Sequence, residues 1–270
     1  MRSIIYNLFL GLILLNTTLF YHHYRNRGCD DMHSRVVFID VGQGDATYIQ
    51  IDKLKILIDT GLESENIVQK LKKITGCDTV KLDHLILTHA DTDHIEGTLQ
   101  LLKKDMVKNI IHNGFLNIDQ DKESFVENQL EAFVKKNNIK NTTSFDIKNF
   151  KKIYPSFYNT NKSDNDNSLM FYVTIGSKTF LFTGDASSKV EDVYINDSAN
   201  VLKLGHHGSK HSTSYDMLKK VNANEYIISA GVNNRYNHPH PEVLDRIYKL
   251  KNSNDLVIRS TFNGDIIYEL

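Results

Sequence analysis

The stretch "LTHADTDHIEG", from Leu87 to Gly97, decides the fold. It follows directly on the apolar run "LDHLIL", which predicts a buried strand. Within six positions it places two imidazoles and two carboxylates, on His89, Asp91, Asp93 and His94. Alternate residues of an extended loop point the same way, and these side chains suit a divalent cation such as zinc or manganese. The stretch therefore predicts a metal site at the end of a strand.

Two further groups of metal-binding residue types occupy equivalent positions. Asp185 follows the run "TFLFTG", and His206 and His207 follow "NVLKLG". Taken singly, a turn aspartate or an ordinary pair of histidines would explain each of them. Because side chains at the ends of strands are held by the sheet, we expect all three groups to meet at one edge. A single carboxylate can bridge two cations, and Asp185 is the candidate for that role.

Composition constrains the function only weakly. The chain has 270 residues and a formal net charge of −1, which permits one large domain or two small ones. This charge gives no argument for a dedicated nucleic-acid binder. It does not exclude an enzyme that acts on a polyanion, because bound metals can supply positive charge. The two cysteines, Cys29 and Cys77, form no C-x-x-C motif, and we expect them to be incidental thiols.

The N-terminal segment is apolar from Ile4 to Tyr21 and carries no charge between Arg2 and Arg25. About 18 such residues are the minimum that spans a bilayer. No small-residue cleavage pattern follows, which favours an uncleaved anchor over a cleaved signal peptide. We expect residues 1–30 to form a signal anchor or signal segment, with residues 33–270 as a folded domain that is extracytoplasmic and membrane-anchored, or secreted. The alternative is a buried or amphipathic N-terminal helix of a cytosolic protein.

Hairpins and β-α units alternate along the rest of the chain. This pattern favours two packed mixed β-sheets with helices on their outer faces over a doubly wound parallel sheet. Ser64 is the candidate N-cap of the first predicted helix. The predicted hairpins are 36–40 with 46–51, 169–175 with 179–183, and 256–260 with 265–268, and the main predicted helices are 64–74, 124–136, 212–221 and 241–251.

The motif "THADTDHIEG" resembles the H-x-H/D-x-D-H signature of the metallo-β-lactamase fold. Four more stretches resemble, in order, the hydrolase domain of the ComEC family of competence DNA-uptake proteins. They are "FIDVGQGDATYI", "NDNSLMFYV…FLFTGD", "LKLGHHGSKHSTS" and "IISAGVNNRYNHPHPEVLDRI". The resemblance runs from Val36 to the C-terminus. The channel-forming domains of that family have no counterpart here, so we expect a free-standing or singly anchored hydrolase domain.

The resemblance implies an αββα four-layer sandwich with two divalent ions, zinc or manganese, at one edge. Its implied ligands are His89 and Asp91 for the first metal, Asp93 and His94 for the second, and Asp185 as the bridge. One member of the histidine pair completes the second site; we favour His207 as the ligand, with His206 beside the substrate.

The sequence departs from the wider fold at one metal ligand. That fold has a further first-metal histidine where this chain reads "SDNDNSLM". Either one of Asn165, Asp166, Asn167 and Ser168 replaces it, or the first site is weaker.

The expected activity is that of a phosphodiesterase or nuclease acting on DNA or another phosphodiester. Two cations would hold a hydroxide that attacks phosphorus, and Asp93 and His206 would belong to the catalytic set. His238 is a candidate to contact the phosphate or protonate the leaving group, or it is a plain turn histidine.

Several nearby residues could assist such an enzyme. Ser209 could bind substrate oxygen or cap the next helix. Lys203, Lys210 and Arg235 flank the motifs and could meet a phosphate backbone. Asp45 lies in a glycine turn and could support a metal ligand.

Two other functions remain open. One is an esterase of the phosphorylcholine-esterase or lactonase type, acting on a small or cell-wall-linked substrate. The other is a non-catalytic binding module that keeps the fold without the chemistry. The sequence identifies no protein partner; the expected partners are a phosphodiester and, through residues 1–30, a membrane.

Overall fold

A computed structural model describes residues 32–117, 125–250 and 256–270. The predicted anchor at residues 1–30 lies outside this part of the chain. Among the residues that are described, no helix has the length and apolar character needed to cross a membrane.

The first sheet is mixed and has seven strands in the order β13-β1-β2-β3-β4-β5-β6. Strands β13, β1, β2 and β3 pair antiparallel, whereas β3 to β6 pair parallel. The strands are β1 (Arg35–Phe38), β2 (Thr47–Ile51), β3 (Leu54–Ile58), β4 (Leu82–Leu87), β5 (Val107–His112), β6 (Asn141–Thr142) and β13 (Ile266–Glu269).

The second sheet is also mixed, with six strands in the order β12-β11-β10-β9-β8-β7. Here β7, β8 and β9 pair antiparallel, and β9 to β12 pair parallel. The strands are β7 (Phe150–Tyr154), β8 (Met170–Ile175), β9 (Lys178–Phe182), β10 (Val201–Lys203), β11 (Glu225–Ile228) and β12 (Val257–Ser260).

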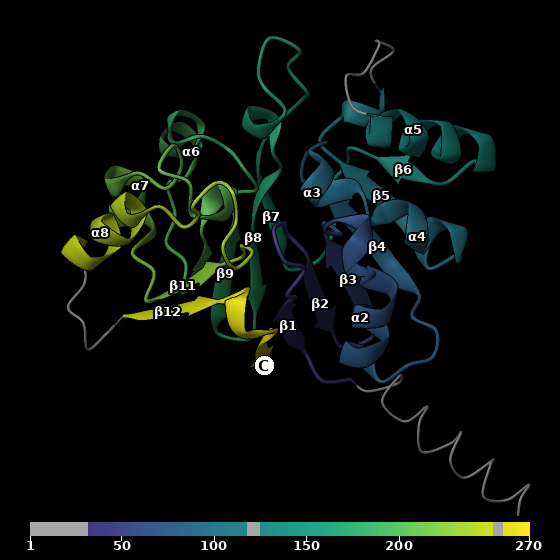
Figure 1. The fold of residues 1–270 in the computed structure, drawn as a ribbon, viewed down its shortest axis with the longest axis horizontal. Coiled ribbons are helices and arrows are strands. Elements are labelled where there is room, and N and C mark those ends of the chain that lie inside the picture. Colours follow the sequence, from purple (N-terminus) through teal and green to yellow (C-terminus); the bar gives the residue numbers. More distant parts are fainter. Residues whose placement is uncertain (1–31, 118–124, 251–255) are drawn as a thin grey trace, which may run out of the picture.

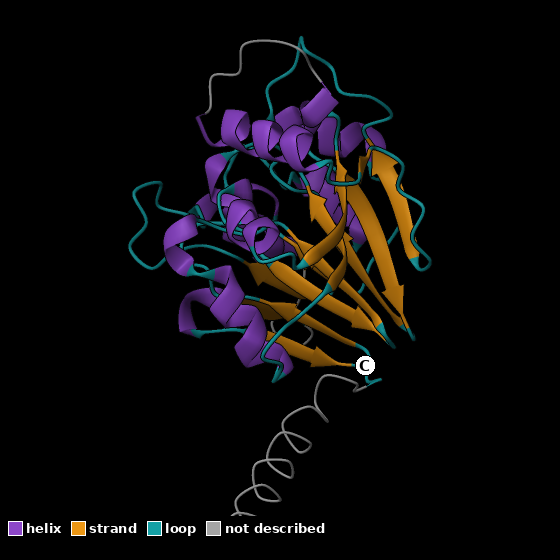
Figure 2. Ribbon diagram, turned by 90° about the vertical axis from the view of Figure 1, so that its right-hand side faces the viewer, coloured by secondary structure: helices purple, strands orange, loops and turns teal. Residues whose placement is uncertain are grey.

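Helices cover the outer faces of both sheets, with the strands between them (Figures 1 and 2). The helices beside the first sheet are α2 (Ile67–Thr75), α3 (Thr92–Ile95), α4 (Thr98–Lys103) and α5 (Phe125–Asn137). Those beside the second are α6 (Ser188–Tyr194), α7 (Tyr215–Val221) and α8 (Pro241–Leu250). The short 3₁₀ turns are η2 (Glu63–Glu65), η3 (Phe115–Asn117), η4 (Asn165–Asn167), η5 (Gly205–Gly208) and η7 (Thr261–Asn263).

Three apolar layers hold this arrangement together. Alternation along β1 sends Val36 and Phe38 into a layer between the two sheets, whereas Val37 joins the layer under α2, α4 and α5. A third layer lies between the second sheet and α6, α7 and α8, where Leu202 and Met217 are fully buried. The predicted αββα sandwich of two mixed sheets is therefore confirmed.

The predicted last hairpin was wrong. Strand β12 pairs with β11 in the second sheet, whereas β13 pairs with β1 in the first. The intervening turn η7 is capped by Ser260, whose side chain accepts the N–H of Phe262. A short polar connection between two apolar runs suits a hairpin or a crossing between sheets equally well, so local pattern could not decide.

Two smaller expectations also fail. Helix α2 is capped by Asn66, whose side chain accepts the N–H of Gln69, whereas Ser64 lies in the preceding 3₁₀ turn. Cys77 is buried and disulfide-bonded, which corrects the expectation of incidental thiols.

Candidate metal centre

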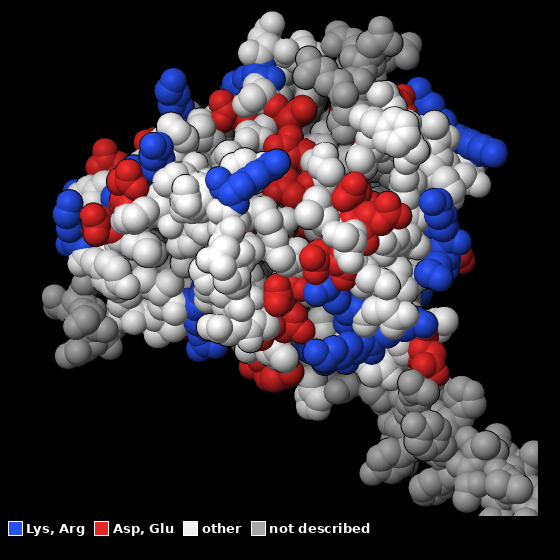
Figure 3. Space-filling model, viewed as in Figure 1, with Lys and Arg blue, Asp and Glu red and all other residues white. Residues whose placement is uncertain are grey.

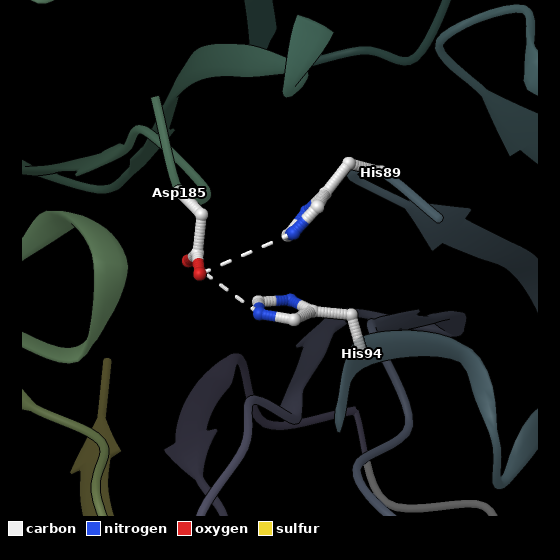
Figure 4. Close-up of side chains that lie close together, drawn as sticks. All are labelled: His89, His94 and Asp185. Atoms are coloured by element: carbon white, nitrogen blue, oxygen red, sulfur yellow. Dashed lines mark ion pairs between the residues drawn. The ribbon is translucent and has the colours of Figure 1, made fainter. Parts of the chain in front are cut away.

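The motif from Leu87 to Gly97 begins at the end of strand β4 and includes helix α3. His89 and His94 are completely buried, and their ring centroids lie 4.1 Å apart. Both rings point at Asp185, which follows β9 in the other sheet (Figure 4). The distance to a carboxylate oxygen of Asp185 is 3.4 Å from His94 Nε2 and 4.0 Å from His89 Nε2. The two halves of the sandwich therefore meet at this carboxylate.

The histidine pair reaches the same place from the turn η5. His207 is buried, and its Nε2 lies 3.2 Å from Asp93 Oδ2 and 3.5 Å from Asp185 Oδ2. His206 Nε2 is 3.7 Å from Asp185, but the His206 side chain is 31% exposed. Both histidines have left-handed backbone, with φ of 47° and 55°, a strained conformation typical of functional sites. The geometry thus separates an inner His207 from an outer His206.

Hydrogen bonds determine which ring nitrogens face the centre. His207 Nδ1 lies 2.9 Å from the carbonyl oxygen of Ser229, and His94 Nδ1 lies 2.8 Å from Asp59 Oδ2. A carbonyl and a carboxylate can only accept, so both Nδ1 atoms carry the proton and leave Nε2 facing inward. The same orientation is imposed on typical metal-binding histidines by their outer partners.

His89 is held in the same way through Thr88. The Thr88 hydroxyl donates to Asp59 Oδ2 over 2.7 Å, so its oxygen is free to accept from His89 Nδ1 at 3.0 Å. Asp59 also accepts the N–H of Thr88 and so fixes both histidines of the motif.

The inward-facing atoms have carboxylate neighbours but no hydrogen-bond partners, as expected of atoms that coordinate a bound ion. Within the described part of the chain, the Nε2 atoms of His89, His94 and His207 and Oδ1 of Asp185 are buried without a hydrogen bond. Buried polar groups are rarely left in this state. Two donors bound tetrahedrally at about 2.1 Å from one ion would lie about 3.4 Å apart. The observed separations of 3.2 to 4.0 Å therefore fit shared cations.

Among the described residues, three overlapping groups of side chains could hold a metal ion; one of them is Asp45, Asp59 and His94, and the other two contain the residues expected as ligands. Asp93, His94 and His207 form one, and His89, His94 and Asp185 form the other. Asp91 joins the second through its Oδ2, 3.6 Å from His89 Nε2. Asp185 lies between the groups, in keeping with the bridging position expected for it.

The charges of the cluster are strongly coupled. Burial raises the pKa of Asp185, but His207, His94 and His89 lower it more, so that the net pKa is well below its usual value. Burial lowers the pKa of His94, but Asp185 and Asp59 raise it more, well above normal. The pKa values of Asp91 and Asp93 are lowered, despite burial, by the neighbouring histidines. The carboxylates are thus ionised and ready to hold positive charge.

Three of the four residues suggested as substitutes for the absent first-metal histidine make hydrogen bonds elsewhere. Asn167 binds the backbone of Asn159 through both ends of its amide, and Ser168 Oγ accepts the N–H of Asp185. Asp166 Oδ1 accepts the N–H of Ser187. His89, Asp91 and Asp185 remain the side chains that the structure brings together at the expected first site.

The prediction that Lys203 meets a phosphate backbone was wrong. Lys203 is buried, and its Nζ lies 2.6 Å from Asp45 Oδ2. Asp45 Oδ1 is 3.7 Å from His207 Nδ1, which places Asp45 behind that histidine as expected. Asp45 also connects the glycine turn to the motif, because its N–H donates to the Asp93 carbonyl.

His238 lies beside the cluster, and Ser209 has a local role. The His238 ring is 5.5 Å from that of His206, and its Nδ1 is buried without a described partner. Burial, together with His207 and His206, lowers the pKa of His238 to about 4. Ser209 Oγ accepts the N–H of His211, and Ser214 rather than Ser209 caps the next helix.

Sequence reasoning missed Asp59. Its signal was present, since "KILIDTG" places an acidic residue after a buried strand just as "TFLFTGD" does for Asp185. It also missed Glu191, which is completely buried in α6 and accepts the N–H of Thr213 behind the histidine loop.

The four-layer fold and its edge cluster define a class of metal-binding proteins built on two packed sheets. The chain belongs to the metallo-β-lactamase superfamily, whose family model matches residues 39–232. Members of this superfamily are generally metal-dependent hydrolases and bind divalent metals, often two.

Competence proteins are among its relatives. ComE operon protein 3 of Bacillus subtilis is 34% identical over 89% of this chain, and Recombination protein 2 of Haemophilus influenzae is 30% identical over 80%. The alignments cover 33% and 26% of those proteins, so the chain spans about a third or less of their length.

Solved structures agree on the fold. The metallo-β-lactamase fold protein YhfI of Bacillus subtilis superposes with a TM-score of 0.55 at 17% identity, over 88% of this chain and all of that one. CmlA, a diiron β-hydroxylase of Streptomyces venezuelae, gives 0.55 at 11% identity, over 89% of this chain and 55% of its own.

Proposed function

We propose that this protein is a metal-dependent phosphodiesterase that acts on DNA or another phosphodiester with two divalent ions, zinc or manganese. The observation that carries the proposal is the convergence of the buried, unpartnered atoms of His89, His94, His207 and Asp185. His89 and Asp91 would hold the first ion, Asp93, His94 and His207 the second, and Asp185 both.

The two ions would supply a water-derived nucleophile at neutral pH and neutralise charge on the phosphoryl oxygens. The residues of the chain would orient the ligands and supply the proton for the leaving oxygen. Asp59 and Ser229 orient the ligand rings. His206, which is partly exposed, and the buried His238 beside it are the residues that a phosphodiester would meet next to the ions. A phosphate anion beside them would raise their pKa values and favour protonation of the leaving oxygen.

The names of the relatives support a nucleic-acid substrate, since they include competence proteins and a recombination protein. A different observation favours the second candidate, an esterase. Figure 3 shows acidic side chains gathered along the middle of one face, between the two halves of the molecule. Such a surface suits a phosphodiester with a cationic group, as in phosphorylcholine esters, better than a long polyanion.

A substrate panel tests the proposal. The metal-free protein would be loaded with zinc or manganese and assayed with bis(p-nitrophenyl) phosphate, a phosphomonoester, a lactone, a phosphorylcholine ester and DNA. We expect hydrolysis of the diester, and DNA cleavage would favour the first candidate. Lactone hydrolysis without diester hydrolysis would contradict the proposal. No metal uptake would point to a binding module.

We further propose that residues 1–30 attach the domain to a membrane on its extracytoplasmic side, or direct its secretion. Cell fractionation with protease added outside intact cells tests this. A domain found in the cytoplasmic fraction and protected from protease would contradict it.

A further inference from the structure

A series of stacked rings leads from the metal cluster to the surface. The ring of His207 lies 6.2 Å from that of His238 with planes 26° apart. The ring of His238 lies in turn 5.6 Å from that of Tyr236, with planes 22° apart. Tyr236 is 45% exposed. The series thus ends in a partly exposed aromatic ring, two rings away from a proposed metal ligand.

The outermost ring carries a planar cation. The guanidinium carbon of Arg235 is 4.7 Å from the centroid of Tyr236, and Arg235 donates to the Tyr236 hydroxyl. Arg235 is exposed, so it can leave the ring for a phosphate without losing a buried partner. Tyrosine and arginine are the side chains on which nucleobases commonly stack.

The backbone beneath these side chains is firmly held, although the loop is at the surface. Asn234 Oδ1 accepts the N–H groups of Tyr236 and His238, and its Nδ2 donates to the carbonyls of Gly231 and His238. The N–H of His240 donates to the carbonyl of Gly208, which ties the loop to the histidine turn. The stacking surface is therefore preorganised relative to the cluster.

A buried polar atom without a hydrogen-bond partner lies next to this surface. His238 is more than nine-tenths buried, and its Nδ1 has no partner among the described residues. The acidic face in Figure 3 makes a long electrostatic track for a polyanion unfavourable. Recognition of a nucleotide here would instead depend on the metals and on stacking next to the scissile bond.

We propose that Tyr236, assisted by Arg235, forms a stacking subsite for the nucleobase adjoining the scissile phosphate. This inference rests on the proposed phosphodiesterase function and narrows its substrate class to nucleoside phosphodiesters. Tyr236 is a specificity-determining residue, because it touches the base and not the reacting atoms.

Two esters with the same scissile bond test this with the metal-loaded full chain. Methyl p-nitrophenyl phosphate and thymidine 5′-(p-nitrophenyl phosphate) share their leaving group and differ by one nucleoside. We expect Tyr236→Ala to lower the ratio of kcat/KM for the nucleoside ester over the methyl ester by about 5- to 150-fold. Tyr236→Phe should retain the ratio, and so should Tyr248→Ala, which removes an exposed tyrosine on α8. An unchanged ratio in Tyr236→Ala overturns the subsite.

A binding measurement separates this inference from the proposed activity. The chain contains no tryptophan, so Tyr236→Trp introduces a single tryptophan whose fluorescence can be excited apart from that of the tyrosines. Thymidine 5′-monophosphate should quench its fluorescence, whereas inorganic phosphate, which has no base, should not. The same titration of Tyr248→Trp is the control. If neither ester is hydrolysed, the proposed function fails, while the titration still decides the subsite; absence of quenching overturns it.

Discussion

His94 and Asp185 come from opposite sheets, yet His94 Nε2 lies 3.4 Å from Asp185 Oδ1 with both side chains buried. His94 belongs to α3, which follows the first sheet's β4, and Asp185 follows the second sheet's β9. The candidate metal centre is therefore built only when the two halves pack.

Removal of the central carboxylate should abolish metal-dependent turnover. Asp185→Asn keeps the shape but replaces the charge that we expect both cations to share. We expect hydrolysis of bis(p-nitrophenyl) phosphate to fall more than about a hundredfold, because loss of an outer partner alone costs 10- to 100-fold. The loss should accompany reduced metal content, measured by elemental analysis.

The control for that variant is Asp216→Asn, an exposed aspartate in the first turn of α7. It should keep both turnover and metal. Far-ultraviolet circular dichroism should show the sandwich intact in both variants. Full turnover in Asp185→Asn would refute the bridging role.

Substitution of Asp59 tests ligand orientation while every proposed ligand is kept. Asp59 has left-handed backbone, with φ of 55°, which asparagine tolerates. Asp59→Asn weakens the acceptor that holds His94 Nδ1 and Thr88. We expect metal affinity to fall by about 10- to 100-fold, measured by competition with a chromophoric chelator. Unaltered affinity would show that Asp59 is not needed to orient the rings.

The architecture could be predicted from sequence, because it follows from local alternation. The β-branched runs and glycine turns marked most strands, and the apolar spacing of Ile67, Val68 and Leu71 marked α2. Partnership between distant strands could not be predicted in this way. Residues 256–260 and 265–268 were both recognised as strands, but their separation into two sheets depends on what each packs against.

The proposed metal ligands could be predicted from the sequence, whereas the residues that hold them in place could be predicted less well. His89, Asp91, Asp93, His94, Asp185 and His207 were identified by residue type and position after strands, and the structure brings them together. The sequence favoured His207 over His206 as the ligand, and the left-handed turn of η5 places His207 inside the cluster and His206 outside it. The burial of Lys203 against Asp45 could not be predicted, because the sequence around a charged residue in a strand does not identify a distant partner.

That buried pair should matter for stability. Lys203→Met leaves Asp45 without its cation in a dry environment. Loss of one partner from a buried pair typically destabilises a protein by about 3–5 kcal/mol. We expect a decrease of this size in the free energy of unfolding, measured with urea. The double variant Asp45→Asn with Lys203→Met should lose less than Lys203→Met alone, since no charge is then stranded. Equal losses would mean that the two residues are not coupled.

Glu191 predicts a specific pH dependence of stability. It is completely buried, and burial raises the pKa of its carboxyl from 4.5 to about 8, against the lowering effect of the Thr213 N–H. Between these two values the folded protein holds a proton that the unfolded chain releases. Its stabilising contribution is therefore fully present below pH 4.5 and is lost as the pH rises through about 8.

Glu191→Gln cannot ionise and still accepts the N–H of Thr213. We expect the free energy of unfolding of the unaltered protein to fall more steeply than that of Glu191→Gln between pH 6 and pH 9, in parallel urea titrations. The comparison cancels the titration of the histidine cluster, which both proteins share; identical slopes would mean that Glu191 is already ionised at neutral pH.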